Sequence, residues 1–127
     1  MLFILISSRA TMKLSKTHAL AKVHKLFEKR TPVLFSVSLR WPLASATGHG
    51  IVTHVSDEVV SVEGRGGELT VQLQDGFEFI LSGHYELSEL QKIGLDLYFR
   101  NLERVRALTF RSEHGDAHMI FEVGADR

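Results

Sequence analysis

The sequence predicts an α+β fold: an N-terminal helix packed on a small, strongly bent antiparallel β-sheet or barrel, with a C-terminal β-hairpin. Three observations predict it. Apolar and polar residues alternate in short runs between residues 33 and 81, as in strands with one buried face. A stretch with helical spacing precedes these runs, and Pro32 separates the two. Two further alternating runs, 105–111 and 117–123, close the chain.

The helix is expected over residues 14–30. Ser15 is its candidate N-cap, and Pro32 ends it because the residue before a proline is excluded from helical geometry. Its apolar face on a helical wheel holds Ala19, Leu20, Val23, Leu26 and Phe27.

Strands are expected at 33–40, at 46–56 and at 59–63, with turns at 41–42, around Asp57 and at 64–67. Gly48 and Gly50 weaken the second of these strands, and they allow a bend or bulge of the kind that curls a sheet into a barrel.

Residues 69–73 and 77–81 are expected to form a hairpin. The Asp75-Gly76 dipeptide suggests a two-residue turn, but that register mixes the apolar and polar faces. A three-residue loop, 74–76, restores the faces and requires Gly76 in the left-handed conformation. The predicted pairs are Leu73 with Phe77, Val71 with Phe79, and Leu69 with Leu81.

Residues 83–104 fit a short helix or an irregular connector. The last hairpin is expected to turn over four residues, 113–116, so that Phe110 meets Met119 and Leu108 meets Phe121. The predicted core is Leu20, Val23, Phe27, Phe35, Val37, Leu39, Val55, Val60, Val62, Leu69, Val71, Leu73, Phe77, Phe79, Leu81, Leu108, Phe110, Met119 and Phe121.

The length of 127 residues suits one domain, expected at 12–127 after a frayed tail at 1–11. Met12 is an alternative start to Met1. There is no cysteine, which excludes disulfides and thiol catalysis. The apolar run at the N-terminus is too short for a secretory signal or a membrane span. We therefore expect a cytoplasmic protein that does not bind membranes.

The net charge is zero, but it is unevenly distributed. Residues 1–40 hold eight lysines and arginines against one acid, and residues 41–103 hold three against ten. A candidate polyanion-binding stripe, His18, Lys22, Lys25 and Lys29, runs along the helix opposite its apolar face. Two interpretations remain: the stripe binds an anionic partner such as RNA, or it is a solvated face whose charge the acidic strands balance.

The sequence contains little evidence for catalysis or for metal binding. There is no Gly-x-Ser-x-Gly nucleophile turn and no phosphate-binding glycine loop. His114, Asp116 and His118 flank the last turn and form the one candidate metal cluster, for which exposed turn residues are the simpler account. We therefore expect no enzyme activity, no cofactor, no metal and no small-molecule substrate.

A helix followed by a strand, a long glycine-containing strand and further short strands resembles the Sm-like family of small barrels, and also SH3-like barrels. The segment 79–84 is similar to the second Sm motif, with Ser82, Gly83 and His84 as candidate loop contacts. Gly83 matches, but Ser82 replaces the family's arginine and His84 its Asp or Asn. The resemblance implies a barrel fold. In the Sm-like family this motif helps to bind RNA between the subunits of a ring, so the resemblance also implies RNA binding by an oligomer.

The function predicted from these observations is a non-catalytic interaction module, binding another protein or a second copy of itself through sheet edges. The alternative is RNA or polyanion binding through the basic helix, with Sm-like assembly as its specific form.

Overall fold

The described part of the chain folds as one antiparallel sheet with two helices. The computed structural model describes residues 11–40, 43–65, 67–73, 76–83, 87–92, 97–99, 101 and 104–123. The elements are β1 (Thr11–Leu14), α1 (Lys16–Lys29), β2 (Val33–Arg40), β3 (Leu43–Val55), β4 (Val59–Gly64), β5 (Gly67–Gln72), β6 (Glu78–Gly83), α2 (Leu87–Lys92), β7 (Val105–Ser112) and β8 (Gly115–Glu122).

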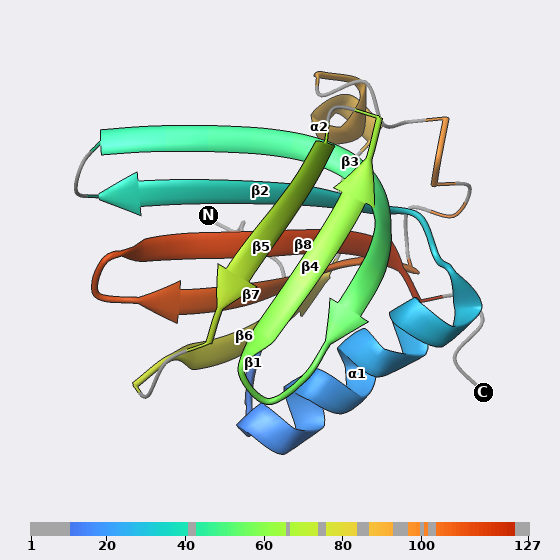
Figure 1. Ribbon diagram of the computed structural model, residues 1–127. Helices are drawn as coiled ribbons and strands as arrows, with labels where there is room; N and C mark the ends of the chain where they lie inside the picture. The colour runs from blue at the N-terminus through green and yellow to red at the C-terminus, as the bar shows by residue number, and fades with distance from the viewer. Residues whose placement is uncertain are drawn as a thin grey trace, which may run out of the picture.

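The strand order is β1-β6-β7-β8-β2-β3-β4-β5, and every pair is antiparallel. Over the described residues the sheet is open, with β1 and β5 as its edges, so the barrel alternative is not realised. The sheet is nevertheless strongly bent. Figure 1 shows β4 and β5 crossing in front of β7, β8 and β2, so that the sheet folds back over itself.

The bend lies in β3, which has two partners. Its first half pairs with β2 as far as Gly50, and its second half pairs with β4 from Gly50 onward. Gly50 faces Gly64 there, and a Cβ at position 50 would overlap the backbone carbonyl of Glu63. The bulge falls just beyond, where the register shifts between Val52 and His54. The expected bend is therefore present, with the bulge displaced from the two glycines.

The main hydrophobic cluster fills the space between the two halves of the sheet. It joins Phe35, Val62 and Phe110 from opposite halves, and it also contains Ala19, Val23 and Leu26 of α1, which lies against β3 and β6. The rings of Phe79 and Phe110 meet edge to face at 5.6 Å. Two predicted core residues are wrong: Phe27 is 37% exposed and Leu39 is 39% exposed. Phe27 packs instead on the ring of His24, and Leu39 lies near the free end of the β2–β3 hairpin.

A second buried cluster occupies the opposite face of the sheet, and the sequence did not predict it. Its members are Leu34, Leu90, Phe99, Val105, Ala107 and Ile120. The reason for the miss is physical: β2, β7 and β8 bury both faces at this end, because α2 and the segment at Phe99 cover the side that alternation assigns to solvent.

Two predicted pairings are wrong. The strands at 69–73 and 77–81 do not form a hairpin: β5 pairs with β4, while β6 lies between β1 and β7. Their apolar faces do enter one cluster, and Gly76 has the expected positive φ, 89°. The last hairpin turns over two residues, so Phe110 meets Ala117 and Leu108 meets Met119. A shift of two residues keeps every side chain on its face, so the pattern does not distinguish these registers.

The ends of α1 are fixed by local hydrogen bonds. The hydroxyl of Ser15 accepts from the backbone N–H of His18 at 3.1 Å, so the helix begins at Lys16 after its predicted N-cap. At the other end Arg30 adopts the left-handed conformation, φ 51°. The N–H groups of Arg30 and Thr31 donate to the carbonyls of Phe27 and Leu26, a Schellman motif. Residue 14, expected in the helix, belongs to β1, a strand that the sequence did not predict.

Two glycines of β3 provide a matched test of the bend. We expect Gly50→Ala to lower the free energy of unfolding by about 1–3 kcal/mol, because the new methyl group forces β3 and β4 apart. Gly48→Ala places its Cβ 3.6 Å from Leu69, an ordinary contact, and is expected to change stability by less than about 0.5 kcal/mol. Urea unfolding of both variants measures the difference. Equal stabilities would contradict the role given to Gly50.

Candidate functional site

The basic stripe of α1 lies beside a groove between the helix and the sheet. Lys22, Lys25 and Lys29 follow one another at spacings of three and four residues, which brings them to one side of the helix. The Schellman motif ends the helix immediately after Lys29 and turns Thr31 toward the start of β2. The groove is therefore bordered by α1 along its length and closed at one end by the exit from the helix.

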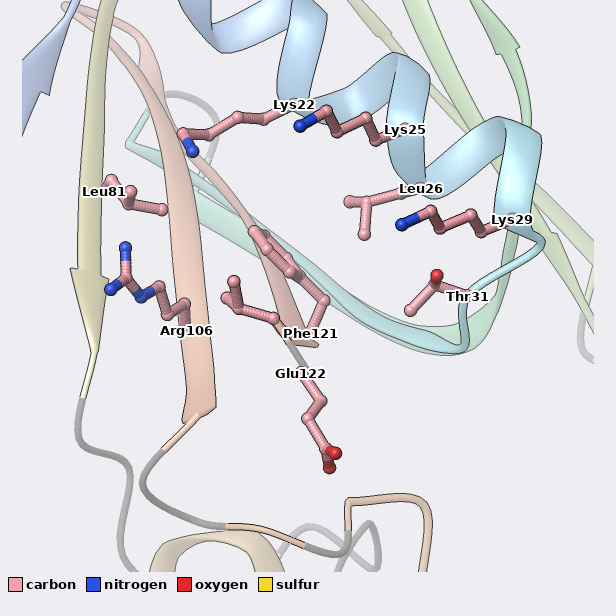
Figure 2. Close-up of a pocket in the computed structure, with 10 residues that line it drawn as sticks. Lys22, Lys25, Leu26, Lys29, Thr31, Leu81, Arg106, Phe121 and Glu122 are labelled. Carbon is pink, nitrogen blue, oxygen red and sulfur yellow. The ribbon is translucent and has the colours of Figure 1, made fainter. Parts of the chain in front are cut away.

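The opposite border of the groove comes from three strands. Leu81 of β6, Arg106 of β7 and Phe121 of β8 line it together with the α1 residues. Figure 2 shows the ammonium groups of Lys22, Lys25 and Lys29 and the guanidinium of Arg106 around an apolar floor. The floor residues Leu26, Leu81 and Phe121 are all buried. The groove is shallow, with a free volume of about 40 Å³.

Two of the four cations lack an acidic partner among the described residues. Lys22 and Arg106 are both half-buried, and no carboxylate in the described ranges forms an ion pair with either. One acid, Glu122, lines the groove together with the cations. Its carboxylate accepts a hydrogen bond from the backbone N–H of Asn101 at 3.2 Å, and Figure 2 shows it extending away from the ammonium groups. The groove therefore presents positive charge to solvent above an apolar surface.

The structure separates the other predicted contacts from this groove. His18 is exposed in the first turn of α1 and does not line the groove. Ser82 and Gly83 lie in β6, where Ser82 pairs with Thr11 and Ala107 and Gly83 pairs with Arg106. His84 lies outside the described residues. Arg106 itself was missed, because a single arginine in an alternating strand carries no signal that it faces a helix far away in the sequence.

The candidate metal cluster is not assembled. His114 lies in the β7–β8 turn with its side chain 70% exposed, whereas Asp116 and His118 lie in β8. Asp116 faces Arg111 instead, with 3.8 Å between Nε and Oδ1. Throughout the described part of the chain, no three His, Asp or Glu side chains are grouped so that they could hold a metal ion.

Comparisons with known proteins assign no family. No family model, no curated protein and no solved structure matches the chain. Neither described helix is long and apolar enough to cross a membrane. The evidence for function therefore rests on the geometry of the chain itself.

His118 gives the fold a dependence on pH. Burial between β2 and β7 lowers the pKa of its imidazole, and nearby Arg111 lowers it further, against an opposing effect of Asp116. Below the ordinary pKa of about 6.5 the unfolded chain therefore takes up a proton that the folded chain resists. We expect the free energy of unfolding to fall as the pH is lowered through this value, and His118→Gln to reduce that fall.

Urea unfolding between pH 7.5 and 5.5 measures this effect. His114→Gln, which removes an exposed histidine from the adjacent turn, is the matched control and should keep the wild-type pH profile. An unchanged profile in His118→Gln would assign the pH dependence to other groups.

Proposed function

We propose that this protein binds an anionic polymer, RNA among the candidates, in the groove along α1. The observation that carries the proposal is the convergence of Lys22, Lys25 and Lys29 with Arg106 from the opposite side of one groove. A solvated helix face accounts for the three lysines. It does not account for a fourth cation supplied by a strand and left without an acid among the described residues.

The physical properties of the groove favour a polymer backbone over an enclosed small molecule. Ligand pockets for small molecules usually enclose several hundred Å³, whereas this groove is shallow and open along its length. A row of cations along such a surface can contact successive phosphates and release their counterions, which makes binding strong at low salt and weak at high salt. Half-burial of Lys22 and Arg106 limits their hydration, so pairing with phosphate displaces little water from them.

The Sm-like form of the proposal is narrower. It adds assembly into an oligomer and contacts from the segment at Ser82, Gly83 and His84. The pairing of Gly83 with Arg106 places this segment next to a residue that lines the groove, which supports the proposed contacts but not the assembly. The small antiparallel sheet after a helix is compatible with it, but SH3-like and other small β folds share that arrangement.

Charge reversal along the groove tests the proposal. We expect the triple variant Lys22→Glu, Lys25→Glu, Lys29→Glu to bind a fluorescent oligouridine roughly tenfold or more weakly at low salt. The wild-type slope of the logarithm of the association constant against log salt should be about −2.8 for four phosphate contacts on a single strand, and the variant, which keeps only Arg106 of the four cations, should have a slope of about −0.7. Fluorescence anisotropy across a salt series measures both.

The matched control carries the same charge change elsewhere. Lys16, Arg40 and Lys92 are exposed and lie outside the groove, so reversing all three alters net charge equally. This control should bind with nearly wild-type affinity. Equal losses in the two triple variants would show that net charge, and not the groove, governs binding, and would overturn the proposal.

Self-association is the second candidate function, favoured by the free edge of β5. Over the described residues β5 pairs only with β4, and it alternates exposed Glu68, Thr70 and Gln72 with half-buried Leu69 and Val71. An unpaired edge of six residues with this alternation offers hydrogen bonds and apolar area to a second strand.

Light scattering behind a sizing column tests the second candidate. We expect a dimer that Thr70→Lys dissociates, because a lysine on an edge strand opposes strand addition. Ser38→Lys, at an exposed position of β2 between β3 and β8, should leave the dimer intact. A monomeric wild-type protein, or dissociation in both variants, would refute association through β5.

A further inference from the structure

A hollow of about 370 Å³ lies beside the exit from α1, where Pro32 and Val33 form part of its wall. Its walls come from four separate segments: the start of β2, the middle of β3, the β4–β5 turn and the segment 97–99. The residues that matter for recognition are His49, Arg65 and Tyr98, with Pro32 and Phe99 beside them. This volume lies within the range of small-ligand sites.

The hollow carries an aromatic pair. The rings of His49 and Tyr98 lie 5.3 Å apart at an interplanar angle of 41°. Both side chains are exposed, Tyr98 by 47%, although neighbouring Phe99 is only 4% exposed. The buried Phe99 anchors the segment to the second cluster, so Tyr98 is held at the surface with part of its ring open to solvent.

Arg65 adds a positive charge to the same hollow. It occupies the β4–β5 turn, and it has no ion pair within the described ranges. The nearest acids along the hairpin are Glu63 and Glu68. They occupy opposite positions in the β4–β5 register, and neither lines the hollow. An aromatic surface beside a guanidinium is the combination that binds a base and its adjoining phosphate.

The groove and the hollow are bordered by consecutive residues at the exit from α1. Thr31 lines the groove and Pro32, the next residue, lines the hollow. A polymer that follows the lysines of α1 toward the C-terminal end of the helix therefore reaches Thr31, whose neighbour Pro32 forms part of the wall of the hollow. Glu122 borders this path, but its carboxylate is engaged by the backbone N–H of Asn101.

We infer that the anionic polymer is a single-stranded nucleic acid, whose backbone follows α1 and one of whose bases stacks in the hollow on His49 and Tyr98. The inference rests on the proposed function and narrows it. Polyphosphate has no group to fill the hollow. The bases of a duplex are already stacked within the double helix, so only an unpaired base is free to enter the hollow.

The experiment compares two probes, an oligouridine and inorganic polyphosphate, each titrated into wild-type protein and variants. Tyr98→Ala should weaken oligouridine binding about tenfold, the loss expected for one stacked base, and leave polyphosphate binding unchanged. Tyr98→Phe keeps the ring and should bind both probes as the wild type does. Leu97→Ala is the matched control, since Leu97 is 88% exposed in the same segment and does not line the hollow.

The outcomes separate this inference from the proposed function. Unchanged oligouridine binding by Tyr98→Ala, or equal weakening of both probes, overturns the base-stacking inference. The charge-reversal variant of α1 then decides the proposed function independently, because loss of polyphosphate binding in that variant supports the groove whatever Tyr98 does. A wild-type protein that binds neither probe overturns both. Thermal melting of each variant confirms that the comparison is made on folded protein.

Discussion

The close approach of β3 and β4 at Gly50 and Gly64 is the constraint on which the rest of the structure depends. A side chain at either position would overlap the backbone of the facing strand, so only glycine permits the approach. There β3 passes from one partner to the other, and the second half of the sheet crosses the first. The space between the halves becomes the main hydrophobic cluster. Without this corner the apolar face of β2, β7 and β8 would lack most of its cover, and α1 would lose part of the surface against which it lies.

The sequence predicted the bounds of single helices and strands better than it predicted which strands pair with each other. The bounds of β2 and the cap of α1 follow from local chemistry: alternation, a serine before the helix and a proline after it. The pairing of β5 with β6 was wrong because proximity in sequence suggested a hairpin. Alternating apolar faces are compatible with any neighbouring strand, so the pattern does not determine the partner. In the structure β5 pairs with β4, and β6 pairs with β1 and β7. The second cluster was missed for a related reason, since alternation alone does not reveal that α2 covers the outer face.

The candidate site shows the same limit. Helical spacing placed Lys22, Lys25 and Lys29 on one stripe, because three lysines on one helix need no tertiary information. The groove became visible only when Arg106 and the apolar floor were brought beside them by β6, β7 and β8. His49, Arg65 and Tyr98 were equally hidden, because each comes from a different segment and none stands in a recognisable motif. The charge asymmetry was compatible with an anionic partner or with charge balance within the fold, and it gave no information about where on the surface a partner would lie.

The pairing of β2 with β8 also has a consequence for the order of folding. Strands β2 to β5 follow one another in sequence and pair in that order, so their contacts are local and close short loops. Joining β2 to β8 brings together residues 76 to 86 positions apart, from Leu39 with Gly115 to Leu34 with Ile120, so a long loop must close before these contacts form, and such pairings form slowly. The groove draws on α1, β6, β7 and β8, so it is completed only when this late closure has occurred. A nascent chain therefore exposes its basic helix well before the groove is complete.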